Sequence, residues 1–328
     1  MKSRDDCVPG VLRLADYLIV LRPTLLFPGW TLLLLGYYHG RLHQHETLAL
    51  TMFPQRESML AWDFNPSLWR TFILYGMLMG AVYIINQIAD RETDARNEKL
   101  YLVAQGHVRL NVIKAEAGAL LIGAAAWALL GFYQNPSYLV LIGLSIFLGI
   151  IYSVPPLRLK GRPILDLLAN AIGYGGVAFL VGWAVVAPID AEAGLKALPY
   201  VLCVGAAFVN TTLPDLTGDS AEGVKTTGVW LGWRRSCAFS LMLLCAALLS
   251  AWLLRDGIAL ITGLVCLPFF VHINFTRQTA AIIRATRIGI LALTLLACLV
   301  FPAYGVVFGG IVLAVRWYYR ARFGMTYP

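Results

Sequence analysis

Residues 117–154 read AGALLIGAAAWALLGFYQNPSYLVLIGLSIFLGIIYSV and contain no Asp, Glu, Lys or Arg. A helix needs roughly 20 apolar residues to cross the hydrocarbon core of a bilayer. The stretch is long enough for two such crossings, and Gln134-Asn-Pro-Ser137 divides it near the middle. It therefore predicts two membrane-spanning helices, 117–134 and 137–154, joined by a short turn.

The rest of the chain has the same character. Of its 328 residues, 59% are hydrophobic and 13% are charged, whereas a soluble domain is about a quarter charged. We predict an all-α integral membrane protein, with one transmembrane domain over residues 1–328 and about nine spanning helices. The predicted spans are 17–38, 70–89, 117–134, 137–154, 167–187, 197–213, 236–254, 258–274 and 288–315.

The last of these stretches, 288–315, is long for one span and contains Pro302. Proline ends or kinks a helix because it lacks the backbone N–H and clashes with the preceding turn. Two interpretations remain open from the sequence: one kinked helix, or a span followed by an interfacial helix.

The distribution of Lys and Arg predicts the orientation, because basic residues accumulate in cytoplasmic loops. It favours a cytoplasmic N-terminal segment, 1–16, and a polar loop, 39–69, on the outside. Nine crossings would place the basic tail after residue 315 outside, against this rule. The net charge of +8 has the same explanation, and nothing in the sequence predicts nucleic-acid binding. The cytoplasmic segments are 1–16, 90–116, 155–166, 214–235 and 275–287.

Acidic residues gather in two of these segments. Asn86, Asp90 and Asp94 follow one another at intervals of four, which places them on one face of a helix. The second segment carries Asp215 and Asp219 at the same interval, followed by Glu222. Both segments come after an even number of crossings, so they must lie on the same side of the membrane.

Carboxylates at the edge of a membrane are costly unless they have partners. Mg²⁺ suits such a site because it takes oxygen ligands and commonly binds one or two carboxylates together with phosphate oxygens. We predict that Asp90, Asp94, Asp215 and Asp219 hold Mg²⁺ against a diphosphate. Two other interpretations remain: helix-end acids in solvated loops, and the intramembrane acids of a transporter.

A third segment, Tyr152-Ser-Val-Pro155-Pro156-Leu-Arg158-Leu-Lys160, lies on the same face. Taken alone, it indicates a rigid Pro-Pro turn with ordinary cytoplasmic charges. Beside two acidic segments, Arg158 and Lys160 are candidates for phosphate contact.

Taken together, the three segments resemble the UbiA superfamily of intramembrane prenyltransferases. Asn86-xxx-Asp90-xxx-Asp94 with Asn97-Glu98-Lys99 is similar to the family's first aspartate motif. The loop from Tyr152 to Lys160 resembles the segment after its fourth helix, and Pro214-Asp215-xx-Gly218-Asp219 resembles its second motif. The similarity runs from Arg22 to about residue 290, with all three motifs in the family's order.

The resemblance implies helices around a central cavity, a cytoplasmic cap and a lateral opening to lipid. It implies Mg²⁺ and diphosphate binding by the four aspartates, assisted by Asn86. The predicted diphosphate-binding residues are Arg22, Arg158, Lys160 and Lys225. The chain departs from the pattern between Lys99 and Gly106, where some members place a phosphate-binding Arg, and at Thr211 and Thr212, which replace a charged pair.

The implied activity is Mg-dependent transfer of an isoprenyl group from a prenyl diphosphate to a lipophilic acceptor, which we expect to be aromatic. The implied location is the cell inner membrane, with the active-site face cytoplasmic. Tyr83, Tyr152 and Tyr174 are candidates for an aromatic cavity wall, although plain packing explains them equally well. A terpene cyclase of the same fold and a non-catalytic transporter or lipid-binding protein remain as alternatives. The acceptor and the length of the donor chain are left open.

Overall fold

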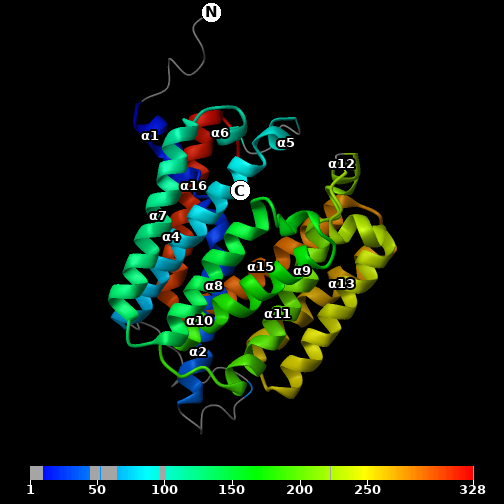
Figure 1. Cartoon of the computed structure of the whole chain (residues 1–328). Helices are drawn as coiled ribbons and strands as arrows, with labels where there is room; N and C mark the ends of the chain where they lie inside the picture. The colour runs from blue at the N-terminus through cyan, green and yellow to red at the C-terminus, as the bar shows by residue number, and fades with distance from the viewer. Residues whose placement is uncertain (1–9, 45–51, 53–64, 97–100, 222, 328) are drawn as a thin grey trace, which may run out of the picture.

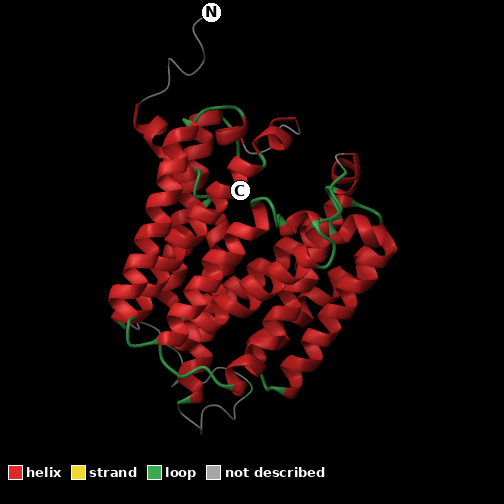
Figure 2. Cartoon of the chain, viewed as in Figure 1, coloured by secondary structure: helices red, strands yellow, loops and turns green. Residues whose placement is uncertain are grey.

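The computed structural model describes residues 10–44, 52, 65–96, 101–221 and 223–327. Within them every regular element is a helix and no strand occurs (Figures 1 and 2). The elements are α1 Gly10–Ile19, η2 Pro23–Leu25, α2 Leu26–His43, α4 Pro66–Ala89, α5 Arg91–Arg96, α6 Tyr101–Ala104, α7 Leu110–Phe132, α8 Pro136–Ser153, η4 Leu159–Gly161, α9 Leu165–Asn170, η5 Ala171–Ala178, α10 Phe179–Ala184, α11 Ala191–Thr211, α12 Leu216–Ala221, α13 Thr227–Leu253, α14 Gly257–Phe275, α15 Thr279–Val300 and α16 Pro302–Phe323.

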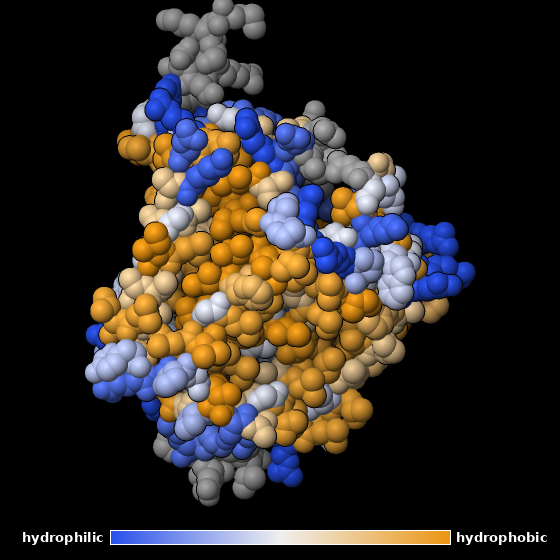
Figure 3. All heavy atoms as spheres, viewed as in Figure 1, coloured by the Kyte–Doolittle hydropathy of each residue, from blue (hydrophilic) through white to orange (hydrophobic). Residues whose placement is uncertain are grey.

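The described chain contains nine helical segments long and apolar enough to cross a membrane, which confirms the predicted fold class. Apolar side chains cover the middle of the molecule, and hydrophilic side chains gather at its two ends (Figure 3). The boundaries differ from the predicted ones by several residues in places. The largest difference is at the last predicted span, 288–315, where the observed segment is Thr279–Val300. The first segment, Gly10–His43, also extends beyond the predicted 17–38 at both ends.

The polar loop predicted over 39–69 is shorter than expected. Residues 39–43 belong to α2, and His39 and Gly40 are buried. Of residues 45–64 only Met52 lies within the described part, where its carbonyl accepts a hydrogen bond from Gly257 N–H at 2.7 Å. This contact puts Met52 beside the start of α14, at the end of the bundle away from the acidic segments.

Four helices that start at that end share one local signal. Each is preceded by an Asn or Asp whose side chain accepts a backbone N–H of the first turn, at 2.8–3.0 Å. A capping side chain of this kind satisfies an N–H that has no partner within the helix. These caps define where the spans begin more sharply than hydropathy does. The capping residues are Asn65 for α4, Asn135 for α8, Asp190 for α11 and Asp256 for α14.

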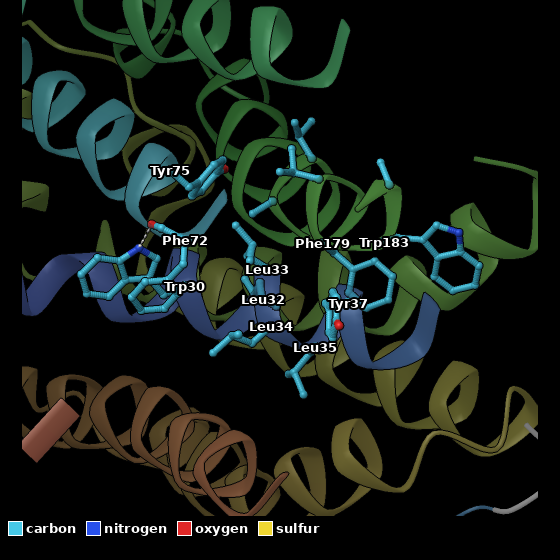
Figure 4. Packing of buried hydrophobic residues seen from close by; sticks show 14 of the residues in the cluster. Trp30, Leu32, Leu33, Leu34, Leu35, Tyr37, Phe72, Tyr75, Phe179 and Trp183 are labelled. Carbon is cyan, nitrogen blue, oxygen red and sulfur yellow. Dashed lines mark hydrogen bonds between the residues drawn. The ribbon is translucent and has the colours of Figure 1, made fainter. Parts of the chain in front are cut away.

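The core forms where α2 crosses α10 at very close range. A Cβ added to Gly36 would lie 1.8 Å from the Phe179 carbonyl oxygen, and one added to Gly182 would lie 1.8 Å from that of Leu33. Only glycine permits this approach, which is how small residues work between membrane helices. Around the crossing, Trp30 stacks on Phe72 and donates its indole N–H to the Phe72 carbonyl at 2.9 Å (Figure 4).

The apolar stretch 288–315 is not one kinked helix, because it divides into the end of α15 and the start of a second helix. The chain breaks at Phe301, and Pro302 starts a separate helix, α16, of 22 residues. Its last turn returns to α1, where Arg322 Nε lies 3.2 Å from the carboxylate of Asp16 and the Tyr318 hydroxyl donates to the same carboxylate at 2.5 Å. The last turn of α16, with Arg322, therefore lies at the same end as the N-terminal helix (Figure 1).

Short elements gather at the end of the bundle that carries the acidic segments. α5, α6 and α12 stand there above the long helices (Figure 1). One irregularity lies within the fifth span, where α9, the π-helix η5 and α10 follow each other without a gap. Such π segments are frequent at functional sites, and η5 contributes directly to the cavities described next.

Candidate active site

The first acidic segment grows out of α4. This helix ends at Ala89, Asp90 caps it, and α5 continues the turn so that Asp94 N–H donates to the Asp90 carbonyl at 2.8 Å. The Asn86 amide donates to the Asp90 carboxylate at 3.1 Å and to the Ser153 hydroxyl at 3.0 Å. Asn86 thus fixes Asp90 against the end of α8.

The second acidic segment lies between α11 and α13. Asp215 precedes α12 and Asp219 lies within it, with the Asp219 N–H donating to the Asp215 carbonyl at 2.8 Å. Gly223 then adopts a positive φ of 70°, which glycine reaches without steric cost. The turn brings back Thr226, whose hydroxyl lies 3.5 Å from the Asp219 carboxylate.

The loop after α8 supplies cations to the first segment. The Lys160 ammonium donates to Asp90 Oδ1, and Arg158 Nη2 lies 3.7 Å from the same oxygen. Lys160 is 15% exposed, whereas Arg158 is 44% exposed. Burial lowers the pKa of Lys160 to about 8, and the negative charge of Asp219 opposes this shift. Lys160 lies between the two acidic segments, in contact with Asp90 and within the field of Asp219.

These groups surround one cavity of about 540 Å³, which we call the acidic cavity. The structure thus brings together all four predicted aspartates, Asn86 and two of the predicted cations. Lys225 is exposed and does not line this cavity, although its neighbours Val224 and Thr226 do. Glu222 lies outside the described residues. The lining comprises Asn86, Asp90, Asp94, Tyr152, Arg158, Lys160, Asp166, Phe208, Thr211, Thr212, Pro214, Asp215, Gly218, Asp219, Val224 and Thr226.

A second cavity of about 190 Å³, the tyrosine chamber, lies between α4, α8 and η5. It contains the three predicted wall residues, Tyr83, Tyr152 and Tyr174, and most of its other lining is apolar. The hydroxyls of Tyr83 and Tyr174 are hydrogen-bonded to each other, and that of Tyr83 also donates to the Leu25 carbonyl at 2.7 Å. Asn86 and Tyr152 line both cavities, so the chamber adjoins the acidic cavity.

Arg22, predicted to bind diphosphate, is not among the residues that line the acidic cavity. It lines the tyrosine chamber and a third cavity of about 130 Å³ under the last turn of α16. Its backbone is left-handed, with φ 54° and ψ 60°. The structure therefore separates Arg22 from Arg158 and Lys160, with which the sequence had grouped it.

Asp166 is a site residue that sequence reasoning missed. It lines the acidic cavity, yet it is fully buried and both of its oxygens accept hydrogen bonds. Thr227 donates its hydroxyl to one oxygen and its N–H to the other at 2.7 Å, while the Ile164 N–H donates to the Thr227 hydroxyl at 2.8 Å. Asp166 thus ties the loop carrying Lys160 to the start of α13. The only feature of the sequence that could have drawn attention to Asp166 is that it is a single acidic residue at the start of an apolar run.

The donor set fits Mg²⁺ with one restriction. Within the described residues, no three Asp, Glu, His or Cys side chains lie close enough together to hold an ion by themselves. Mg²⁺ commonly takes only one or two carboxylates and completes its octahedron with water and substrate phosphate. An arrangement of paired carboxylates facing a basic loop across one cavity fits that mode of binding.

Fold and site together define a helical membrane protein with a polar cavity of about 540 Å³ beside an apolar chamber. A model of the UbiA prenyltransferase family matches residues 50–287. The chain therefore belongs to the UbiA prenyltransferase family, which confirms the resemblance drawn from its three motifs.

Curated relatives match about half of the chain. The bacteriochlorophyll synthase 34 kDa chain of Chloroflexus aurantiacus is 32% identical over 179 residues, 52% of this chain and 56% of that protein. The digeranylgeranylglyceryl phosphate synthase of Methanothrix thermoacetophila is 32% identical over 56% of this chain and 65% of its own. A probable homogentisate phytyltransferase 2 of rice is 32% identical over 52% and 48%. The chain thus spans about half to two thirds of the length of these relatives.

Solved structures share the fold. A UbiA homolog from Archaeoglobus fulgidus, bound to GPP and Mg²⁺, superposes with a TM-score of 0.60 at 17% identity, covering 89% of this chain and 99% of that one. A UbiA homolog from Aeropyrum pernix gives a TM-score of 0.62 at 18% identity, covering 86% and 96%. These likenesses concern the fold alone.

Proposed function

We propose that this chain transfers an isoprenyl group from a prenyl diphosphate to a lipophilic acceptor and depends on Mg²⁺. The main support for this proposal is that the acidic cavity, with its four aspartates and two cations, adjoins the apolar tyrosine chamber through Asn86 and Tyr152. A prenyl diphosphate has the same division, with a polyanionic head joined to a hydrocarbon chain.

Each half of the site has a defined task in this reaction. Asp90, Asp94, Asp215 and Asp219 would hold Mg²⁺, which neutralises the leaving diphosphate when bound. Lys160 and Arg158 approach the same cavity and would pair with phosphate oxygens. The allylic C1–O bond breaks with its electron pair leaving on the diphosphate, and C1 then bonds to the acceptor, which gives up a proton.

The tyrosine chamber is suited to stabilise the allylic carbocation that forms when the C1–O bond breaks. An allylic carbocation is stabilised over the faces of aromatic rings, and Tyr83, Tyr152 and Tyr174 surround the space next to the acidic cavity. The hydrogen bond between Tyr83 and Tyr174 orients both rings.

The location proposed with this activity is the cell inner membrane, with the acidic cavity on the cytoplasmic side. The basic character of this end supports it, since both the N-terminal helix and the arginines of α16 gather there. The short elements around the cavity mouth, α5, α6 and α12, would form the predicted cap.

The test is diphosphate release by the purified chain in detergent. Geranylgeranyl diphosphate is supplied with Mg²⁺ or with EDTA, and with or without a panel of acceptors. Transfer predicts release that requires both Mg²⁺ and an acceptor, and that is lost in Asp90→Ala and Asp219→Ala. Release without an acceptor would indicate a cyclase or hydrolase. Absence of release under all conditions would reject the enzymatic proposal in favour of a transporter or lipid-binding protein.

A further inference from the structure

Charge is distributed unevenly along the chain. Residues 1–222 contain 17 acidic and 16 basic residues, whereas residues 223–328 contain ten basic residues and one acidic residue, Asp256. Asp256 caps α14 at the end of the bundle away from the acidic cavity. The basic residues that α13, α14 and α15 bring to the acidic-cavity end therefore have no acid among them in this part of the chain.

Three arginines gather where the start of α13 meets the end of α14. The Asn274 amide donates to the Cys237 carbonyl at 3.3 Å, which fastens the last turn of α14 to this part of α13. Arg234 and Arg235 shortly precede Cys237, and Arg277 shortly follows Asn274, so the contact brings the three arginines into one region. All three side chains are exposed.

Two exposed aromatic rings accompany these arginines. Gly232, with φ 71° and ψ 170°, interrupts the helical backbone of α13, and Trp230 lies in the turn before this break. Trp230 is 58% exposed, and Phe275, at the end of α14, is 84% exposed. Exposed aromatic rings at the end of a membrane helix are typical of the boundary between lipid headgroups and acyl chains. We call Trp230, Arg234, Arg235, Phe275 and Arg277 the basic patch.

The arginines of the basic patch have no counter-charge. Among the residues that the structure describes, none forms a hydrogen bond or an ion pair with their side chains. Arg322, at the same end of the bundle, is by contrast paired with the carboxylate of Asp16. Lys225, which does not line the acidic cavity, is exposed two residues before α13 and adds a further positive charge. The basic patch is thus a concentration of uncompensated positive charge.

An apolar surface extends from the basic patch toward the middle of the bundle. Met242 and Leu249 of α13 and Leu264 and Val271 of α14 all have exposed side chains. In a bilayer these side chains face hydrocarbon, because they belong to two of the spanning segments. A ligand with an anionic head and long hydrocarbon chains matches both parts of this surface.

We infer that the basic patch binds an anionic phospholipid, with its phosphate paired with Arg234, Arg235 and Arg277 and its acyl chains along α13 and α14. A guanidinium suits this role because it binds phosphate through two parallel hydrogen bonds. Trp230 and Phe275 would lie at the level of the glycerol backbone. An anionic lipid is favoured over a zwitterionic one, because each basic residue at the surface of an anionic leaflet contributes about a fivefold gain in affinity.

This binding is independent of the proposed transfer reaction. None of the five residues of the basic patch lines the acidic cavity, the tyrosine chamber or the cavity under α16. Lipid binding is therefore measurable without turnover, and substitutions in the basic patch leave the aspartates of the acidic cavity in place.

The experiment measures lipid bound to the full chain by native mass spectrometry in detergent without Mg²⁺. Phosphatidylglycerol and phosphatidylcholine with identical acyl chains are titrated separately. We expect the wild-type chain to bind phosphatidylglycerol at least about tenfold more tightly, and this preference to shrink as salt is added. The double variant Arg234→Gln/Arg235→Gln should lose most of the preference, whereas Arg234→Lys/Arg235→Lys should keep much of it.

Arg109→Gln/Lys114→Gln is the matched control. Both residues are exposed, they lie at the start of α7 at the same end of the bundle, and the change removes the same amount of charge. This control should bind phosphatidylglycerol as the wild-type chain does. An equal loss in the control and in Arg234→Gln/Arg235→Gln would show that net charge alone explains the preference and would overturn the inference. Equal affinity of the wild-type chain for the two lipids would also overturn it.

The prenyl diphosphate donor is a second anionic amphiphile at this end of the molecule. Geranylgeranyl diphosphate should not displace phosphatidylglycerol, and its KM should stay within about twofold in Arg234→Gln/Arg235→Gln. Displacement, or a raised donor KM, would assign the basic patch to the donor and overturn the inference. If the wild-type chain releases no diphosphate with any acceptor, the transfer proposal falls, and the lipid measurement still decides the role of the basic patch.

Discussion

The two acidic segments look alike in sequence, but the structure supports them differently. Asp90 extends a helix of 24 residues, α4, and is contacted by Asn86, Lys160 and Arg158. Asp219 lies on α12, a helix of only six residues, where Thr226 approaches its carboxylate at 3.5 Å. Equal spacing of carboxylates therefore does not mean equal environments.

This difference indicates which contacts hold the aspartates of each segment in place. The first segment is held directly, by side chains that neutralise and orient Asp90. The second has an additional support in the buried Asp166, which fixes Thr227 and, one residue before it, Thr226. We therefore expect substitution of an aspartate in either segment to reduce activity by a similar factor. Substitution of the residues that support the aspartates should affect the two segments differently.

The largest effect is expected for the carboxylates themselves. Asp90→Asn and Asp219→Asn each remove one charge from a pair that would hold Mg²⁺, and several kcal/mol of leaving-group stabilisation depend on that ion. Each should lower kcat/KM by at least about 1000-fold, measured as diphosphate release. If one variant keeps substantial activity, the two segments are not equivalent in function, and the expectation that both aspartates are required is wrong.

A smaller effect should distinguish the two cations at Asp90. Lys160 contacts the carboxylate directly and is mostly buried, whereas Arg158 lies at 3.7 Å and is 44% exposed. Lys160→Met should reduce kcat/KM about 100-fold and Arg158→Met about tenfold, because an exposed charge interacts weakly through water. Steady-state kinetics at saturating Mg²⁺ measures both. A larger loss of kcat/KM in Arg158→Met than in Lys160→Met would show that burial does not determine which cation contributes more to activity.

Asp166→Asn tests the indirect support of the second segment. The amide cannot accept both hydrogen bonds from Thr227, so we expect the concentration of Mg²⁺ needed for half-maximal activity to rise about 10- to 100-fold. Thermal unfolding should show a loss of about 2 kcal/mol in stability. Asp256→Asn is the matched control, because Asp256 is likewise a buried carboxylate, 2% exposed and 3.1 Å from His39, at the opposite end. It should reduce stability and leave the Mg²⁺ requirement unchanged.

The smallest effect is expected at Thr226, whose contact with Asp219 is long. Thr226→Val removes this contact and the cap that the hydroxyl provides for α13, and should raise the Mg²⁺ requirement about threefold with about 1 kcal/mol of lost stability. Thr226→Ser keeps the hydroxyl and should resemble wild type. A Val variant with an unchanged Mg²⁺ requirement would mean that Asp219 is positioned without Thr226.

The sequence by itself determined the membrane class, most of the spans and the two acidic segments. The reason is that crossing a bilayer demands long apolar runs, and charges that interrupt such runs stand out. The order of the motifs then indicated the UbiA family, and the structure places all four aspartates around one cavity. The length of an apolar run and the spacing of acidic residues are properties of residues close in the chain, so they can be recognised without knowledge of tertiary contacts.

Only the tertiary structure decided which cations share that cavity. Three of the predicted cations lie near one end of the bundle, but in different surroundings. Arg22 lines the cavity under the last turn of α16, Lys160 contacts Asp90 and Lys225 is exposed. It also decided the role of Asp166 and the return of α16 onto Asp16. These outcomes depend on which helices pack together, and packing joins residues far apart in the chain through contacts that no local pattern encodes.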